Sequence, residues 1–241
     1  MAKRLDSKAI DRVVEELRTA HGDNLASIVL YGSVAAGDQV ELHSDFNLLI
    51  ALNRITANDL RLSHTAMSDW HSLGQPPPVY FSVEELDRAA DVFPIEFLQM
   101  EKARRVLYGR DPFEFVEISA ANLRHQTEYE LRTKLIQLRR LYIPASTSVE
   151  KLADLMRDSL ASFAALFRAV LILHGQEPPV SKADSVNSTV DLLGLESFPF
   201  EKILVLRAKT ETKLTEAAAN SVFSAYLTQI ERVIEAVDQI D

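Results

Sequence analysis

Apolar positions along the first fifty residues switch between helical and strand-like spacing. Residues 10–17 place apolar side chains at the i, i+3, i+4 and i+7 positions of a helix. The next apolar runs, residues 27–31 and 46–52, are short and rich in β-branched and aliphatic side chains, which is typical of strands. The pattern therefore predicts a helix, a strand, a connecting segment and a second strand.

Two capping boxes predict where the next helices begin. Thr56 is followed three residues later by Asp59, and this pair predicts a helix that continues to about Ser72. Ser82 and Glu85 repeat the same spacing and predict a short helix. Three further apolar runs are expected to be strands: residues 79–81, 95–100 and 105–108. The first half of the chain therefore predicts a small unit of mixed helices and strands.

From residue 123 onward the apolar pattern becomes that of long helices. One apolar stripe recurs at helical spacing over residues 131–142, a second over residues 152–171, and a third long helix is expected over roughly residues 213–240. We therefore predict an α+β fold, in which a small mixed-sheet domain at residues 1–117 precedes an all-helical bundle at residues 118–241.

Composition narrows the range of functions. The chain of 241 residues carries a formal net charge of −9, which disfavours duplex nucleic acid as a partner because that affinity depends on clustered cations. It contains no cysteine, which excludes disulfides, thiolate metal sites and cysteine nucleophiles. No apolar run reaches the ~20 residues that span a bilayer, and the N-terminus lacks the apolar core of a secretory signal. We therefore expect a cytoplasmic protein that does not bind membranes.

The segment around the first two predicted strands carries the most informative chemistry. Gly32 and Ser33 follow directly after the first strand, where backbone N–H groups and a hydroxyl can cradle an anion. Asp45 and Asn47 lie two positions apart at the start of the second strand, so their side chains share one face. Two oxygen ligands on one face can bind a hard cation such as Mg²⁺.

This arrangement resembles the nucleotidyltransferase superfamily that includes kanamycin nucleotidyltransferase and the minimal bacterial nucleotidyltransferases. The family signature is a Gly-Ser pair, about a dozen residues, a carboxylate-x-carboxylate pair on a strand, and a third carboxylate on a neighbouring strand. Gly32 and Ser33 followed by Asp45 match the first part. Glu96, in a run that is predicted to be a strand, matches the third position. The match covers roughly residues 26–108.

The resemblance implies a nucleoside triphosphate as the ligand and Mg²⁺ as the cofactor. In the family, the paired acids hold metal ions that bridge the nucleotide phosphates, and the third acid deprotonates or orients an acceptor hydroxyl. Carried over to this chain, Gly32 and Ser33 would bind the phosphates. Asp45 and Glu96 would be the catalytic residues, and Asn47 would join them as a metal ligand. The acceptor hydroxyl stays open between an aminoglycoside-like antibiotic, a protein and an RNA end.

Asn47 departs from the family signature, which has a carboxylate at this position. An amide keeps one oxygen for coordination but removes a negative charge, so a second metal ion is expected to bind more weakly. One hypothesis is a nucleotidyltransferase with weak or narrow transfer activity. Another is a catalytically inactive module of the same fold that serves binding or regulation, with Asn47 forming only a hydrogen bond at the sheet edge.

The other residues of the motif also have structural interpretations. The Gly-Ser pair at 32–33 could form a simple turn at the end of a strand, and Asp45 could cap a turn. Glu96 could pair with Arg104 or Arg105, because a carboxylate among apolar neighbours usually needs a partner.

The first long helix carries an excess of arginine and lysine. Arg132 and Arg139 are seven residues apart and share a face, where guanidinium groups could bind phosphates or an acidic acceptor. A solvated face whose charges pair within the protein is the alternative. The long apolar helices could also supply the surface of a homodimer.

A second resemblance concerns the helical half. Arg168, followed six residues later by His174, resembles the motif of HEPN ribonucleases, in which the Arg and the His act on an RNA phosphodiester. The intervening residues are apolar, and Gly175 follows His174 directly. The alternative interpretation places His174 at the end of a helix that Gly175 terminates.

Overall fold

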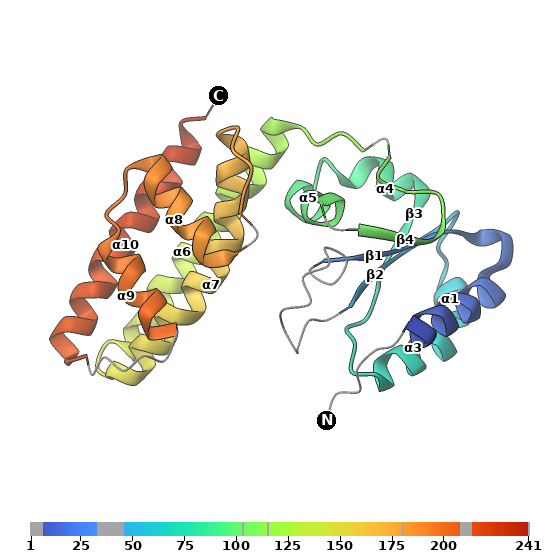
Figure 1. The fold of residues 1–241 in the computed structure, drawn as a ribbon, viewed down its shortest axis with the longest axis horizontal. Coiled ribbons are helices and arrows are strands. Elements are labelled where there is room, and N and C mark those ends of the chain that lie inside the picture. Colours follow the sequence, from blue (N-terminus) through green and yellow to red (C-terminus); the bar gives the residue numbers. More distant parts are fainter. Residues whose placement is uncertain are drawn as a thin grey trace. The chain divides into compact units, whose positions relative to one another are not determined.

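The chain divides into two compact units in the computed structural model, which describes residues 7–32, 46–102, 104–114, 116–179, 181–207 and 214–240. The units are Met1–Ser119 and Ala120–Asp241, so the division falls two residues after the expected boundary. The first unit combines helices with a sheet and the second is helical (Figure 1), which confirms the predicted α+β fold class. No helix within the described residues is long and apolar enough to cross a membrane.

A four-stranded sheet forms the centre of the first unit. In chain order its strands are β1 (Leu25–Tyr31), β2 (Asn47–Leu52), β3 (Val79–Ser82) and β4 (Arg104–Gly109). The spatial order is β3-β2-β1-β4, with β1 antiparallel to both neighbours and β2 parallel to β3. Tyr31 at the end of β1 pairs with Asn47 on one side and with Arg104 on the other. These three residues therefore form a row at one end of the sheet.

Helices cover both faces of this sheet (Figure 1). Helices α1 (Ser7–His21) and α3 (His64–Ser72) lie on one face, and α4 (Val83–Ala89) and α5 (Pro94–Lys102) lie on the other. The alternation of side chains along β2 supplies both cores: Leu48 packs with Trp70 of α3, whereas Leu49 packs with Phe97 of α5. By the same alternation, Asn47 lies on the face of the sheet that α4 and α5 cover.

Both predicted capping boxes are confirmed. The Thr56 backbone N–H donates to Asp59 Oδ2 at 2.9 Å, and the Asp59 N–H donates to Thr56 Oγ1 at 3.2 Å. Ser82 and Glu85 exchange the equivalent bonds at 2.7 and 3.1 Å. Each box satisfies backbone donors that the first helical turn would otherwise leave without partners.

The helix predicted from Thr56 to Ser72 is interrupted at Ser63, where α2 (Ala57–Leu62) ends and α3 begins. The Ser63 hydroxyl lies 2.8 Å from His21 Nε2 in a buried contact with the end of α1. A tertiary hydrogen bond of this kind leaves no trace in the local sequence, which explains why the pattern predicts one helix.

Residues 95–100 belong to helix α5, so the prediction of a strand there is wrong. Pro94 stands in the first turn of the helix, where its fixed φ is suitable and its missing N–H is not needed. The Phe97 N–H donates to the carbonyl of Phe93 at 3.0 Å, and Phe97 and Met100 are buried against the sheet. The apolar run is so short that it fits both the helical and the strand periodicity. Pro94 is the signal in the sequence that favours the helix.

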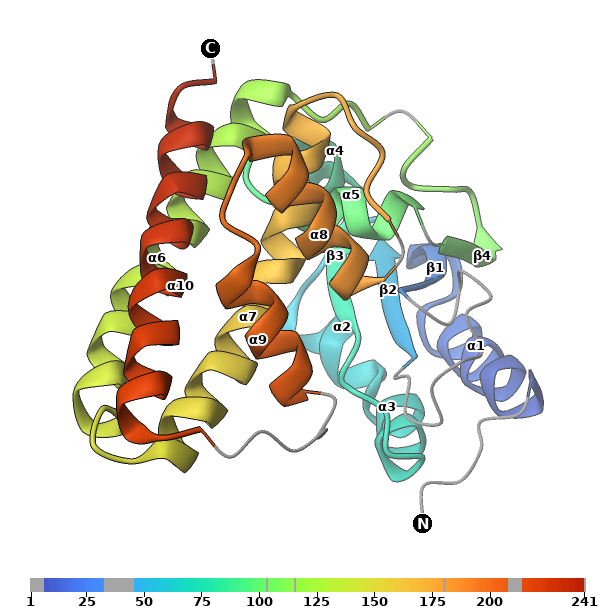
Figure 2. The same cartoon turned by 60° about the vertical axis from the view of Figure 1, so that its left-hand side comes forward.

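Within the described residues the second unit contains five helices. They are α6 (Ala120–Ala145), α7 (Val149–Leu173), α8 (Lys182–Leu193), α9 (Phe198–Arg207) and α10 (Glu216–Asp238). Figure 2 shows α6, α7 and α10 lying alongside one another. The three long helices are those that the apolar stripes predict. Helices α8 and α9 were not predicted, although Ser181 caps the start of α8 and Gly194, at φ +58°, ends it.

An aromatic cluster forms part of the core of the helical unit. Phe163 and Phe200 each make an edge contact with the Tyr226 ring, at centroid distances of 6.3 and 5.8 Å. Tyr226 is fully buried, which raises the pKa of its hydroxyl. Ser159 donates a hydrogen bond to that hydroxyl at 3.3 Å. The cluster joins α7, α9 and α10.

Candidate functional site

The structure describes part of the nucleotide site that the sequence predicts. Gly32 and Asn47 lie within the described residues, whereas Ser33 and Asp45 lie outside them. Gly32 directly follows β1 and Asn47 is the first residue of β2. The antiparallel pairing of the two strands therefore places Gly32 beside the start of β2.

Gly32 makes close contact with the side chain of Asn47. The residue has a φ of +94°, a conformation that side-chain-bearing L residues rarely adopt. A Cβ atom placed on Gly32 would lie 3.0 Å from Asn47 Nδ2, tighter than an ordinary van der Waals contact. Both the backbone conformation and the short distance therefore favour glycine, and the Asn47 amide lies against the backbone at the end of β1.

Tyr31 and Arg104 complete the row of residues that begins with Asn47. Tyr31 is half-buried in the centre of the row, and burial raises the pKa of its hydroxyl. Arg104 Nε lies 2.9 Å from Asp111 Oδ2, and Arg104 Nη2 lies 2.8 Å from the same oxygen. The remaining donor, Nη1, binds the carbonyl of Glu101. Asp111 is therefore a partner of Arg104, one of the two arginines that the sequence analysis considers as partners of Glu96.

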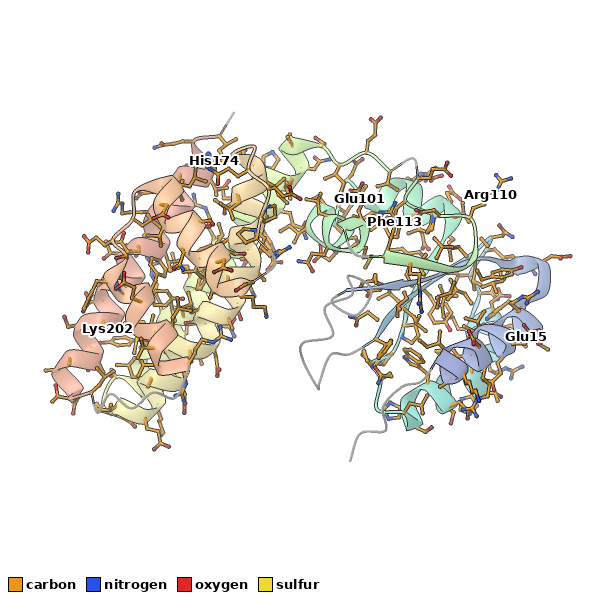
Figure 3. The ribbon with its side chains drawn as sticks, in the orientation of Figure 1. Glu15, Glu101, Arg110, Phe113, His174 and Lys202 are labelled. Carbon is orange, nitrogen blue, oxygen red and sulfur yellow. The ribbon has the colours of Figure 1, made fainter. Side chains whose placement is uncertain are left out.

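The Arg104 guanidinium also lies over an aromatic ring. Its Cζ is 5.5 Å from the centroid of Phe113, which makes an edge contact with Phe97 of α5. Figure 3 shows Phe113 beside β4, with Glu101 on α5. The Arg104 guanidinium thus binds Asp111 and the Glu101 carbonyl and stacks over Phe113. These contacts connect β4 with α5 and with the turn that follows β4.

The start of β2 has a second contact, made by Phe46, the residue directly before Asn47. The Phe46 N–H donates to the side-chain oxygen of Gln75 at 2.8 Å. The Phe46 side chain packs against the core beneath α1 and α3. Sequence reasoning did not single out Gln75, because it stands 29 positions away in a proline-rich segment that carries no motif.

Glu96 does not lie on a strand next to Asn47. It occupies the first turn of α5 and its side chain is exposed. A carboxylate in the first turn of a helix interacts favourably with the helix dipole, which gives Glu96 a structural role at this position. Its assignment to the strand position of the third carboxylate is therefore corrected.

The described strands of the sheet carry no carboxylate. Strands β1, β2, β3 and β4 have the sequences LASIVLY, NLLIAL, VYFS and RRVLYG. Leu49 pairs with Val79 on the parallel neighbour β3, so continuing this register places Pro77 opposite Asn47. In the part of the chain that the structure describes, no group of three or more His, Asp or Glu side chains could hold a metal ion.

The donor set suits a hard cation only weakly. Asn47 offers one amide oxygen, and Asp45 would add a carboxylate from two positions earlier in the sequence. Oxygen donors of these types are those that Mg²⁺ prefers, and Mg²⁺ sites in phosphate-binding proteins often use one or two protein ligands together with the phosphates. The residues therefore fit one magnesium ion held jointly with a nucleotide better than two ions held by the protein.

Arg132 and Arg139 form ion pairs on the surface of the helical unit. Arg139 Nη2 lies 2.5 Å from Glu231 of α10, and Arg132 Nε lies 2.7 Å from Glu128 of α6. The hydrogen bond from Arg132 lowers the pKa of Glu128. Arg132 also approaches Asp238 at 3.7 Å. The two arginines thus contact acidic residues of the same unit, as the structural alternative predicts.

His174 and Arg168 lie at different places around α7. His174 is the exposed C-cap residue, and Gly175 has a φ of +73° and donates its N–H to Ile172 at 2.9 Å. Figure 3 shows His174 at this end of the helix. Arg168 donates to the carbonyl of Pro179, and burial lowers its pKa. The prediction of His174 as a helix-terminal residue is confirmed.

Two surface hollows in the described residues lie away from Gly32. One, of about 450 Å³, is lined by Arg18 of α1 and Tyr108 of β4 near the opposite end of β1. The other, of about 170 Å³, lies between α6 and α7 and is lined by Leu138 and Phe163. Neither of these two hollows is lined by a residue of the row that contains Asn47.

Comparisons with known proteins identify the fold. No protein-family model and no curated protein sequence matches the chain at a significant level. Among solved structures, the chain is similar to spectinomycin adenyltransferase AAD(9) from Enterococcus faecialis, whose crystal structure was determined with ATP and spectinomycin. The likeness covers 95% of this chain and 99% of the other, with a TM-score of 0.58 and 13% sequence identity. The chain therefore has the nucleotidyltransferase-like fold that its sequence predicts.

Proposed function

We propose that the chain binds a nucleoside triphosphate together with one Mg²⁺ ion at Gly32, Ser33, Asp45 and Asn47, and that it transfers the nucleotidyl group inefficiently. The observation that carries the proposal is the contact between Gly32, at φ +94°, and the Asn47 amide, 3.0 Å from the position of a Cβ on Gly32. A glycine here leaves backbone N–H groups open to phosphate oxygens, and the side chain that lies beside it, Asn47, also carries an amide oxygen that could bind a metal ion.

Each residue has a separate task in this proposal. Gly32 and Ser33 provide backbone N–H groups and a hydroxyl for the phosphate oxygens. Asp45 provides a carboxylate and Asn47 an amide oxygen for the metal. The Asn47 Nδ2 group lies against Gly32, so the amide is held in place by packing. When bound, Mg²⁺ would neutralise charge on the phosphates and polarise them.

Transfer should be inefficient because the described strands lack the other two carboxylates of the family signature. The position of the second is Asn47, and β3, the parallel neighbour of β2, has the sequence VYFS. Without a third acid on a neighbouring strand, no described strand residue can deprotonate an acceptor hydroxyl. This observation equally favours a second candidate function, a nucleotide-binding module that regulates and does not catalyse.

The similar adenyltransferase helps to choose the first ligand to test. Its structure contains ATP and spectinomycin, so ATP is the first nucleotide and spectinomycin the first hydroxyl acceptor to test with this chain. We assign no nucleotide contact to Arg132 or Arg139, because both already contact acidic side chains. We assign no role in the nucleotide site to Glu96, because it lies on helix α5 and not on a strand next to Asn47.

Calorimetric titration tests the proposal. ATP, GTP, CTP and UTP, each with Mg²⁺, are titrated into the wild-type chain and into Asp45→Ala. We expect saturable binding of at least one nucleotide to wild type and its loss in Asp45→Ala, because this variant removes the carboxylate that we assign to the metal. Absence of binding to wild type, or equal binding to both chains, rejects the proposal.

A further inference from the structure

The backbone N–H of Phe46, the residue directly before β2, is held by a side chain from a distant loop. The Phe46 N–H donates to Gln75 Oε1 at 2.8 Å, a short and favourable distance for this type of bond. Phe46 directly precedes Asn47, and its side chain packs into the core beneath α1 and α3. The residue before the proposed metal ligand is therefore fixed both through its side chain and through its backbone.

The loop that carries Gln75 is itself held in place. The buried Trp70 donates from its indole Nε1 to the carbonyl of Pro76 at 2.8 Å. Three consecutive prolines, residues 76–78, restrict the backbone between Gln75 and β3. Gln75 Nε2 makes a longer contact of 3.4 Å with the carbonyl of Leu73. The Gln75 side chain that accepts the Phe46 hydrogen bond therefore belongs to a segment whose backbone has little conformational freedom.

We infer that Gln75 is a positioning residue for the nucleotide site, an inference that rests on the proposed function. A peptide group is planar, so fixing the Phe46 N–H fixes the peptide plane on the N-terminal side of Phe46. Because the Phe46 side chain is also packed in the core, the backbone torsions of Phe46 have little freedom. The torsions of Phe46, together with the pairing of Asn47 with Tyr31, set the direction in which the Asn47 side chain leaves the strand. Asn47 meets Gly32 on one side, so Gln75 and Gly32 together determine where its amide oxygen is presented.

The bond acts through Phe46 and not through contact with the ligand. Removing the acceptor leaves the chain free to sample other orientations at the start of β2. Only part of that population can bind, which weakens the apparent affinity in proportion. A purely structural bond would instead lower thermal stability and leave affinity unchanged.

Three variants separate these roles. Gln75→Leu removes the acceptor at similar size, and Gln75→Glu keeps an oxygen acceptor. Asn53→Ala is the matched control, because Asn53 makes a side-chain bond of 2.8 Å to the Asp23 carbonyl just beyond the opposite end of β2. Each is measured by calorimetry with the Mg-nucleotide that wild type binds, by thermal unfolding, and by hydrogen exchange of the Phe46 amide. Fluorescence of Trp70, the single tryptophan, reports whether the fold is retained.

We expect Gln75→Leu to speed exchange of the Phe46 amide and to weaken Mg-nucleotide affinity about tenfold. Gln75→Glu should keep the slow exchange, and Asn53→Ala should keep both the exchange and the affinity. Wild-type affinity in Gln75→Leu overturns the inference, as does equal weakening in Asn53→Ala. If Gln75→Leu does not fold, Gln75→Asn, whose amide is one methylene short, replaces it with the same expectations. Absence of binding to wild type is a distinct result, since it rejects the proposed function itself and this inference with it.

Discussion

The Asn47 amide lies against the backbone of Gly32, 3.0 Å from where a Cβ of residue 32 would stand. The two residues come from neighbouring antiparallel strands and are separated by 15 positions in the sequence. The contact joins the predicted phosphate-binding glycine to the predicted metal ligand. It also provides a way to disturb Asn47 without changing it.

Replacing Gly32 by alanine should weaken nucleotide binding through Asn47. The new Cβ would lie 3.0 Å from Nδ2, so the amide must move by a few tenths of an ångström. We expect this shift of a metal ligand to reduce nucleotide affinity about tenfold. The positive φ adds about 1 kcal/mol of destabilisation. Gly22→Ala is the control, because Gly22 has a φ of +51° and no atom within 4 Å of its would-be Cβ. Calorimetry and thermal unfolding should show loss of stability in both variants and loss of affinity only in Gly32→Ala.

Restoring the carboxylate at residue 47 should strengthen metal binding. Asn47→Asp adds one negative charge to the donor set, for which we expect Mg²⁺ affinity in the presence of nucleotide to rise about tenfold. Titration of Mg²⁺ at fixed nucleotide measures the change. Identical affinities in the two chains would mean that residue 47 is not a ligand. Transfer of label from a nucleotide at equal rates by the wild-type chain and Asn47→Asp would contradict the inefficiency that we attribute to Asn47.

Glu96→Gln should leave nucleotide binding unchanged. Glu96 lies in the exposed first turn of α5, where loss of its charge weakens the interaction with the helix dipole by about 0.3–1 kcal/mol. Thermal unfolding should register that small loss, whereas calorimetry should give the wild-type affinity. A clear reduction in affinity would return Glu96 to the site despite its position on a helix.

Much of the fold could be predicted because short-range patterns determine it. Thr56 and Asp59 form the capping box that their spacing predicts, and the apolar runs at 27–31 and 46–52 become paired strands. These features depend on neighbours within a few positions. The prediction of a strand at residues 95–100 is wrong, because a run of six residues is too short to distinguish helical from strand periodicity.

The candidate site could be predicted only in part, because two of its relationships are tertiary. The sequence identifies Gly32 and Asn47 as candidates, but not that one packs against the other. Gln75 has no local signal, since its role depends on the Phe46 N–H from another element. Glu96 stands at the position in the sequence where the family signature has its third carboxylate, but it lies on a helix and not on a strand. The spacing of a motif therefore identifies candidate residues, whereas the packing of helices and strands determines which of these residues come into contact.

A buried histidine predicts that the first unit loses stability in mild acid. His21 is 7% exposed, with Nε2 bonded to Ser63 and Nδ1 buried without a hydrogen-bond partner in the described structure. Burial lowers the pKa of His21 below its ordinary value of 6.5, and the nearby Asp59 carboxylate opposes this in part. Below pH 6.5 the unfolded chain gains a proton that the folded chain does not, so the free energy of unfolding falls as pH decreases from 6.5 to the folded pKa.

Thermal unfolding between pH 7 and pH 5 measures this effect. His21→Gln should be less stable than wild type at pH 7 and should lose less stability on acidification. His64→Gln, on the exposed surface of α3, is the control and should retain the wild-type pH dependence. A wild-type slope in His21→Gln would show that other groups cause the acid sensitivity. Asp59, whose pKa is lowered chiefly by the Thr56 hydroxyl, contributes in the same direction at lower pH.

The dependence of nucleotide binding on Mg²⁺ tests the proposed site most directly. ATP, or whichever nucleotide binds tightest, is titrated into the wild-type chain once with Mg²⁺ and once with excess chelator. Saturable heat with Mg²⁺ and none with chelator is the predicted result, because Asp45 and Asn47 would contact the phosphates through the metal. Equal binding under both conditions, or binding under neither, would contradict a metal-linked nucleotide site at the junction of β1 and β2.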